Sequence, residues 1–221
     1  MNSYSESEIK KIVAEVVGKY LNSADNTAES GVEHSILLET SARHAHITGE
    51  AFIKLFGKDA KLNEVRKLSQ TGEFLSDRRV KLVTQKGAID NVAVLGPLRK
   101  AVQVELSRTD CRQLGIDAPV NLSGDLTGAG DVTIIGEKGV LEAKGSVIVA
   151  KAHIHLTPAD AVRRKLKNGQ IVSVKIKSGR PVTLDGVEVR VGDNFAEAFH
   201  IDFDEANAAG AKDGTQAEII Y

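Results

Sequence analysis

One short pattern occurs twice in this chain, and it limits the fold more than any other feature. The segments His44-Ala45-His46-Ile47-Thr48 and His153-Ile154-His155-Leu156-Thr157 each carry two histidines ahead of a threonine. An acidic helix start, an apolar helical pattern and a glycine, Gly57 or Gly169, follow each copy. Threonine is a favoured residue before the first helical turn, so each copy predicts a strand that runs into a helix. Two matching corners of this kind indicate an internal duplication that produced two related β-rich units.

Short aliphatic runs surround both copies and predict a mainly β protein. From 78 to 150, and again beyond 170, runs rich in Val, Ile and Leu are separated by Gly, Asp and Pro. Tryptophan is absent and aromatic residues make up 4% of the chain, so the core must be aliphatic. The remaining elements are expected as a strand over 34–42, a helix over 49–56, a helical turn within 112–118, a helix started by Thr157, Pro158 and Asp160, and a helix around 204–209.

The N-terminal segment predicts an amphipathic helix over residues 5–21. Its apolar residues follow helical spacing, Ser5 and Glu8 form a capping-box pattern, and a polar linker follows. Periodicity alone favours packing of this helix on its own protein, and docking on a partner is the alternative.

Composition excludes several classes of function. The net charge of −1 gives no general electrostatic reason to expect nucleic acid or an anionic membrane surface as a partner. No apolar run is long enough to cross a bilayer, and the polar, acidic start is unlike a secretory signal. Cys111 is the single cysteine, so no disulfide within the chain can form, which fits a reducing compartment. We therefore expect an intracellular protein.

The histidine pairs favour metal binding. Residues i and i+2 of a strand point to the same side, so both histidines of a pair can reach one ion. Neutral imidazole is a favoured zinc ligand. His200 is a further candidate, and the nearby Asp202 and Asp204 could orient imidazole rings. A single such pair is a weak signal, but two pairs at matched corners strengthen it. His34 lacks this context and is interpreted as structural.

Arg99 and Glu105 share one face if the chain around them is extended. Glu105 then becomes a candidate carboxylate ligand, and the guanidinium of Arg99 a candidate phosphate-binding group. Spacing alone, however, favours an ordinary solvated strand face. The glycine-rich segment 123–131 could bind an anion through backbone N–H groups, although a simple turn is favoured. Cys111 could be an acyl-carrying nucleophile, but a buried structural cysteine is favoured.

Together these residues resemble the PduL-type phosphate propanoyltransferase family. The resemblance runs from about residue 34 to the C-terminus. It is carried by Ser41-Ala42-Arg43-His44-Ala45-His46, Gly96-Pro97-Leu98-Arg99-Lys100, Gln103-Val104-Glu105, Ser123-Gly124-Asp125, His153-Ile154-His155, His200-Ile201-Asp202 and Asp204-Glu205-Ala206-Asn207-Ala208. Two positions depart from the pattern, because Lys151-Ala152 and Val120-Asn121-Leu122 stand where the family more often has an arginine.

The resemblance implies two β-barrels with short capping helices and an active site between them. The expected domains are an N-terminal helix and linker over 1–29, a first barrel over 43–151, and a second barrel formed by 30–42 with 152–221. The implied cofactors are two metal ions, usually zinc. His44, His46 and Glu105 would bind one ion, whose open position meets the sulfur of coenzyme A. His153, His155 and His200 would bind the other, completed by water, and Arg99 would bind phosphate.

The implied reaction converts short-chain acyl-CoA and phosphate reversibly into acyl phosphate and coenzyme A. The alternatives are a metal-dependent hydrolase that uses metal-bound water, and a non-catalytic ligand-binding barrel. The resemblance also implies that the helix over 5–21 docks on shell or core proteins of a bacterial microcompartment, with the cytoplasm as the other location. We expect a homo-oligomer, most simply a dimer, with neither nucleic acid nor a membrane as a partner.

Overall fold

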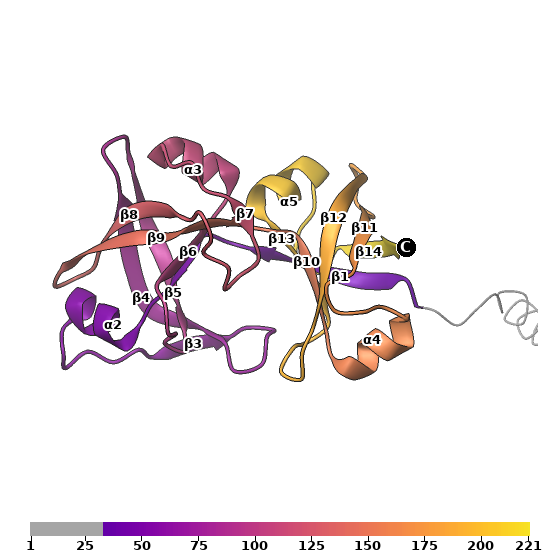
Figure 1. Cartoon of the computed structure of the whole chain (residues 1–221), viewed down its shortest axis with the longest axis horizontal. Helices are drawn as coiled ribbons and strands as arrows, with labels where there is room; N and C mark the ends of the chain where they lie inside the picture. Colours follow the sequence, from indigo (N-terminus) through magenta and orange to yellow (C-terminus); the bar gives the residue numbers. More distant parts are fainter. Residues whose placement is uncertain (1–32) are drawn as a thin grey trace, which may run out of the picture. The chain divides into compact units, whose positions relative to one another are not determined.

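In a computed structural model, the chain from Glu33 to Tyr221 forms two closed six-stranded β-barrels and four short helices (Figure 1). His34–Tyr221 is one compact unit. The predicted mainly β fold with two barrels and capping helices is thereby confirmed. The predicted helix over 5–21 and its linker lie outside the described residues.

The first barrel is closed by six strands in the order β2-β5-β4-β8-β9-β6, with β6 returning to β2. Two short strands, β3 and β7, extend it at β4 and β9. The bounds of these strands are β2 (His44–His46), β3 (Glu64–Lys67), β4 (Phe74–Val83), β5 (Ala88–Gly96), β6 (Gln103–Leu106), β7 (Val120–Asn121), β8 (Gly130–Ile135) and β9 (Val140–Ala150).

The second barrel repeats the same arrangement in the order β10-β12-β11-β14-β1-β13. Its histidine strand β10 is parallel to β12 and antiparallel to β13, just as β2 is parallel to β5 and antiparallel to β6. This matching order supports the duplication that the sequence indicates. The bounds are β1 (Ser35–Ser41), β10 (His153–Leu156), β11 (Ile171–Ile176), β12 (Val182–Val191), β13 (Ala198–Asp202) and β14 (Gln216–Ile220).

The chain crosses between the barrels at two equivalent places. Strand β1 belongs to the second barrel and continues through Ala42 and Arg43 into β2 of the first. Strand β9 belongs to the first barrel and continues through Lys151 and Ala152 into β10 of the second. Both histidine pairs therefore begin directly after a crossing. The expected domain boundaries at 42/43 and 151/152 stay a prediction.

Each barrel has a separate aliphatic core. Side chains alternate across each strand, so every second residue points into the barrel. Val92, Val94 and Ile134 are fully buried in the first core, and Ile154 and Val174 are fully buried in the second. These packed interiors make the strands that carry the histidines a rigid support.

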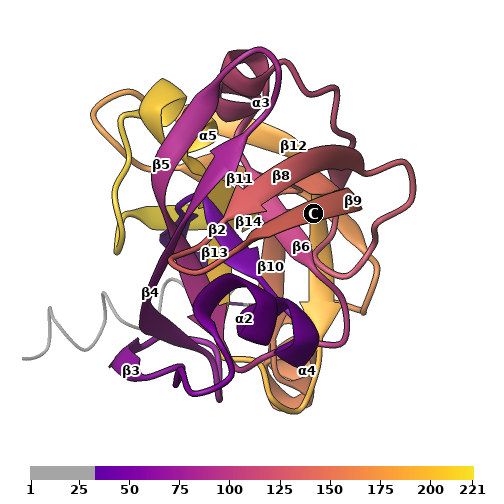
Figure 2. The same ribbon diagram turned by 90° about the vertical axis from the view of Figure 1, so that its left-hand side faces the viewer.

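Each helix begins at a capping residue that directly follows a strand. Thr48 and Thr157 start α2 and α4, as predicted, and Ser107 and Asp202 start α3 and α5. Helices α2 and α3 lie on opposite sides of the first barrel, as two views show (Figures 1 and 2). The bounds are α2 (Gly49–Phe56), α3 (Arg108–Leu114), α4 (Pro158–Arg164) and α5 (Phe203–Ala209).

Two helix boundaries differ from prediction. The helical turn expected within 112–118 is α3, which starts earlier because Ser107 and Asp110 form a complete capping box. Helix α4 stops at Arg164, well before Gly169, because Lys165 adopts the left-handed conformation (φ 54°) and ends the helix.

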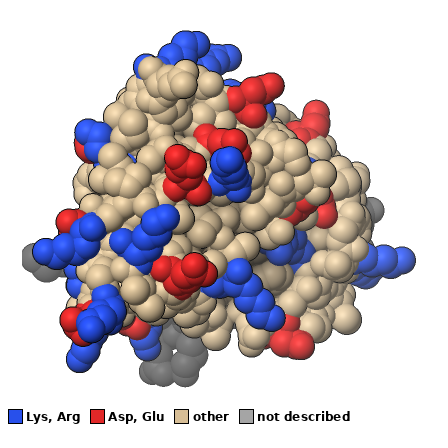
Figure 3. All heavy atoms as spheres, turned by 60° about the vertical axis from the view of Figure 1, so that its left-hand side comes forward, with Lys and Arg blue, Asp and Glu red and all other residues tan. Residues whose placement is uncertain are grey.

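Charged side chains of both signs are mixed on the face of the first barrel in Figure 3, without a continuous field of one sign. No helix among the described residues is long and apolar enough to span a membrane.

The capping box of α5 makes folding sensitive to pH. Burial raises the pKa of Glu205 to about 7, from an ordinary value of 4.5. The folded state therefore favours the neutral form of Glu205. The resulting contribution to the free energy of unfolding is present below pH 4.5 and is lost as the pH rises through 7. Glu205→Gln keeps an oxygen for the backbone N–H of Asp202 and cannot ionise. We expect the melting temperature of the wild type to fall by a few degrees relative to this variant between about pH 5 and about pH 8. Parallel melting curves across that range would contradict the assignment.

Candidate metal centre and substrate cleft

The first cluster joins β2 to β6. His44 and His46 project from β2, and Glu105 lies on β6 directly opposite His44 in the antiparallel register. One oxygen of Glu105, Oε1, is 3.6 Å from Nε2 of His44 and 4.0 Å from Nε2 of His46. One ligand atom from each residue lies within 4.8 Å of the others. The sequence-predicted set is therefore brought together, at a spacing suited to a shared ion.

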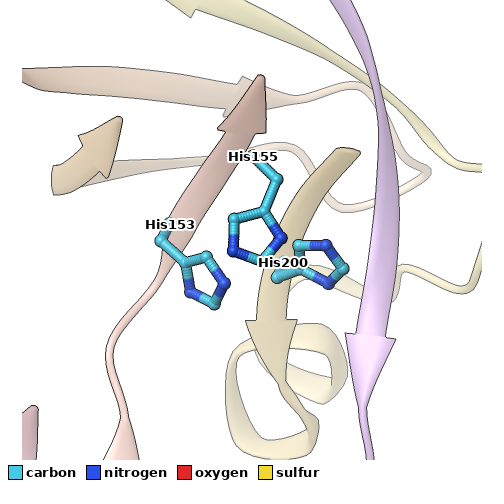
Figure 4. Close-up of side chains that lie close together, drawn as sticks. All are labelled: His153, His155 and His200. Atoms are coloured by element: carbon cyan, nitrogen blue, oxygen red, sulfur yellow. The ribbon is translucent and has the colours of Figure 1, made fainter. Parts of the chain in front are cut away.

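The second cluster joins β10 to β13 in the same way (Figure 4). His153 and His155 project from β10, and His200 lies on β13 directly opposite His153. The ring centroid of His200 lies 5.1 Å from that of His153 and 4.9 Å from that of His155. Ligand atoms of the three imidazoles again lie within 4.8 Å of one another.

The two clusters occupy equivalent positions in the duplicated fold. In each, the third member is the cross-strand partner of the first histidine, which makes Glu105 the counterpart of His200. In each barrel two cluster residues also stand two positions before a helix N-cap. His46 and Glu105 precede Thr48 and Ser107, and His155 and His200 precede Thr157 and Asp202. The capped corner fixes the end of each strand and hence the direction of the side chain there.

Backbone carbonyls orient the first histidine of each pair. Nδ1 of His44 lies 2.7 Å from the carbonyl oxygen of Ala42, and Nδ1 of His153 lies 2.7 Å from that of Lys151. A carbonyl only accepts, so both Nδ1 atoms carry a proton, and Nε2 keeps its lone pair whenever the ring is neutral. The crossing segments therefore prepare two imidazoles as ligands through Nε2.

Most of the imidazoles are held neutral. Burial lowers the pKa of His153 and His200 to about 4. Burial, with the positive charge of a neighbouring histidine, lowers the pKa of His46 and His155 to about 2. A neutral imidazole is the form that binds a metal ion.

His44 and Glu105 behave as a pair. Burial lowers the pKa of His44, but the negative charge of Glu105 and the hydrogen bonds to Glu105 and to the carbonyl of Ala42 together outweigh this effect and raise the pKa above its ordinary value. Burial raises the pKa of Glu105, yet the charge of His44 and the hydrogen bonds from His44 and Ser123 lower it well below its usual range. The first cluster thus contains an ionised carboxylate that favours a cation.

Buried ring nitrogens without hydrogen-bond partners indicate whether the clusters suit a metal ion. Nδ1 of His46 and both ring nitrogens of His155 are buried without a hydrogen-bond partner among the described residues. Buried polar groups rarely lack partners, so such atoms require an explanation. Each cluster offers three protein ligands of the types that catalytic zinc sites use, with a fourth position open. The residues present therefore fit a metal ion at each cluster.

Both clusters line one cavity of ≈ 670 Å³, which also receives Arg99, Ser123 and Arg190. The negative charge of Glu105 contributes to the pKa of His153, His155 and His200, so the clusters are electrostatically coupled. The cavity is large enough for the reacting part of an organic substrate.

Arg99 does not share a strand with Glu105, which corrects the extended-chain expectation. Strand β6 starts at Gln103, and Arg99 lies in the connection from β5, where its N–H donates to the carbonyl of Ile47. Its guanidinium nevertheless reaches the cavity. It donates to Glu73 Oε1 at 2.6 Å and to Ser123 Oγ at 3.1 Å.

Two glutamines support the clusters, and neither was predicted as a site residue. Nε2 of Gln103 donates to Glu105 Oε1 at 2.6 Å and to Ser123 Oγ at 2.8 Å, while its oxygen accepts from the N–H of Gly124. Gln70, from the first barrel, exchanges two hydrogen bonds with the backbone of Ala196 in the second. Its Nε2 is also 3.3 Å from Nε2 of His200. The sequence signal that could have indicated the role of Gln103 is its place two residues before Glu105, on the same face of the strand.

The other sequence candidates have structural environments. Asp202 caps α5 and Asp204 accepts from the N–H of Thr109, so the expectation that they orient imidazoles is wrong. Cys111 is buried, and burial raises the pKa of its thiol to about 11, which does not suit a nucleophile. His34 contacts the carbonyl of Ile219 and the ring of Tyr221. In the segment 123–131 the backbone forms turns, as favoured.

Comparison with known proteins agrees with this geometry. The model of the family described as phosphate propanoyltransferase matches residues 37–212. A phosphate propanoyltransferase of Listeria monocytogenes is 44% identical over 87% of this chain and 88% of its own length. Those of Alkaliphilus metalliredigens and Thermotoga maritima are 42% and 44% identical, over 97% and 85% of this chain and 99% and 90% of their own lengths. On this evidence the chain belongs to the phosphate propanoyltransferase family of enzymes.

Proposed function

We propose that this protein transfers a short-chain acyl group between coenzyme A and inorganic phosphate at a centre that holds two zinc ions. The observation that carries the proposal is the convergence of two three-residue ligand sets, one from each barrel, on a single cavity beside Arg99. Family membership supports propanoyl-CoA as a substrate to test first.

His44, His46 and Glu105 would hold one ion, and His153, His155 and His200 the other. Three ligands of these types suit zinc, although ligand type alone admits cobalt or nickel. When bound, such ions supply Lewis-acid stabilisation for a thiolate leaving group and for negative charge that develops on the thioester carbonyl oxygen.

The chain's own residues position the nucleophile. The planar fork of Arg99 can bind two phosphate oxygens at once, and Ser123 and Glu73 hold that fork at the cavity wall. A phosphate oxygen then forms a bond to the carbonyl carbon, and the carbon–sulfur bond breaks to release coenzyme A as its thiolate. This direct attack needs no acyl-enzyme, in agreement with the buried, high-pKa thiol of Cys111.

The cellular setting is also a proposal. The helical pattern over 5–21 and its polar linker support docking on microcompartment proteins, and we propose a homo-oligomer, most simply a dimer. Both ideas rest on the sequence pattern and the family resemblance.

The ligand assignment is tested by removing one donor at a time. We expect Glu105→Ala or His46→Ala to lose one of two bound metal ions and to lower activity by more than about 100-fold, since even residues that only support ligands contribute about 10–100-fold. Elemental analysis and coenzyme A release from propanoyl-CoA, with and without phosphate, measure both effects. His34→Ala removes a histidine outside both clusters and should change neither.

The same assay separates the proposal from its alternative. Coenzyme A release that does not depend on phosphate would identify a hydrolase. Full activity in either ligand variant, or after complete chelation, would refute the metal centre.

Gln103 should act on the first site alone. Gln103→Leu removes the hydrogen bonds to Glu105 and Ser123 at similar volume, and its counterpart opposite His155, Ala198, has no polar side chain. We expect about 10–100-fold weaker binding of one ion and unchanged binding of the other in a chelator titration. Gln113→Leu, at an exposed glutamine on α3, is the matched control. Equal weakening of both ions would show a general loss of structure instead.

Arg99 should bind phosphate without binding metal. We expect Arg99→Ala to keep both ions and to raise the KM for phosphate by about 10–100-fold, the effect of losing charge-assisted hydrogen bonds. Phosphate saturation curves at fixed propanoyl-CoA measure this shift. Unchanged phosphate saturation would remove Arg99 from the proposed mechanism.

A further inference from the structure

A second arginine, Arg190, enters the cavity from the other barrel. It lies on β12 in register with His155 on the neighbouring parallel strand β10. Neighbouring residues in register point to the same face of a sheet, so Arg190 projects on the side of the second histidine cluster. It lines the cavity together with that cluster.

Ring stacking holds the guanidinium of Arg190 in place. Its Cζ lies 5.5 Å from the ring centroid of Phe195, within the range of a cation–π contact. Phe195 in turn stacks on the imidazole of His155, with centroids 4.0 Å apart and ring planes inclined by 16°. Arg190, Phe195 and His155 thus form a layered group that aligns the cation with the second cluster.

Arg190 makes no hydrogen bond or ion pair to any described residue. The carboxylates that influence it have other partners: Glu188 pairs with Lys151, Glu73 pairs with Arg99, and Glu105 belongs to the first cluster. Burial and the positive charge of Arg99 lower the pKa of Arg190. Its ordinary value of 12.5 is so high that the group still remains charged at neutral pH. A half-buried cation without an ion-pair partner among the described residues is suited to an anionic ligand.

We infer that Arg190 binds the phosphate that accepts the acyl group, as inorganic phosphate in one direction and as the phosphate of acyl phosphate in the other. This inference rests on the proposed function and extends it, because residues from both barrels then form the phosphate site. Arg99 approaches from the first barrel and Arg190 from the second, within electrostatic range of each other.

The phosphates of coenzyme A are the other source of the same chemistry. They are separated from the sulfur by the length of the pantetheine arm. Arg190 lies beside His155 and within range of Glu105, so it borders both clusters, where the thioester must react. Its position therefore favours the phosphate that attacks over the phosphates of the carrier.

Kinetics with both substrates varied test the inference. We expect Arg190→Gln to raise the KM for phosphate, and for propanoyl phosphate in reverse, by about 10–100-fold. The KM values for propanoyl-CoA and coenzyme A should stay within about twofold, because that ligand loses no contact. Arg190→Lys keeps the charge without the planar fork and should recover part of the loss. Arg112→Gln, at an exposed arginine on α3 that does not line the cavity, is the matched control.

A binding measurement supplies a readout that does not need turnover. Inorganic phosphate should raise the melting temperature of the metal-loaded wild type, and of Arg112→Gln, but much less that of Arg190→Gln. Metal content should be unchanged in all three proteins. If Arg190→Gln does not fold, the same measurement on Arg190→Lys tests the inference, since lysine retains a long side chain over Phe195.

Two results would overturn the inference. Phosphate saturation that is unchanged in Arg190→Gln and Arg190→Lys would remove Arg190 from the site. A rise in the KM for propanoyl-CoA alone would assign it to the carrier's phosphates. Failure of the proposed function looks different, because the wild type itself would then release coenzyme A without any dependence on phosphate.

Discussion

The exchange of strands between the two barrels is the constraint on which the rest of this structure depends. Strand β1 completes the second barrel and leads into the first histidine pair, and β9 completes the first barrel and leads into the second pair. Neither barrel can close without the segment that precedes the other's histidines. Assembly of the two cores therefore brings the two clusters together, and the carbonyls of the crossing segments, at Ala42 and Lys151, orient one imidazole of each pair.

Rigidity at the strand ends complements this arrangement. Four residues of the clusters stand two positions ahead of a capped helix, and a side-chain oxygen on the N-cap fixes the first turn of each. Because the strands pack on aliphatic interiors and stop at defined corners, the ligand side chains have little freedom. Gln70 and Gln103 add hydrogen bonds where the backbone alone does not fix the geometry.

The sequence predicted the fold class and both histidine pairs because these depend on local patterns. Alternation along strands and the threonine caps at Thr48 and Thr157 are readable within a few residues. The residues that join each cluster through strand register were harder to predict. Glu105 and His200 became ligand candidates through their residue type and the family resemblance, whereas the pairing of each with a first histidine is visible only in the folded sheets. Gln70 and Arg190 were missed because their contacts join distant segments and follow no motif, whereas Gln103 was quoted within the motif Gln103-Val104-Glu105 but without a role. Arg99 was misplaced on a strand because a connecting segment can look extended.

The substitution of a carboxylate for an imidazole at one pair of equivalent positions gives the two halves different characters. A divalent ion held by three neutral imidazoles keeps its whole double charge, whereas one held with Glu105 has half of that charge offset by its own ligand. An ion at the His200 cluster would therefore be the stronger electrophile and would hold an anion more tightly than an ion at the Glu105 cluster. Two positions that the fold makes equivalent would in this way differ in charge, one attracting anions more strongly and the other releasing them more readily.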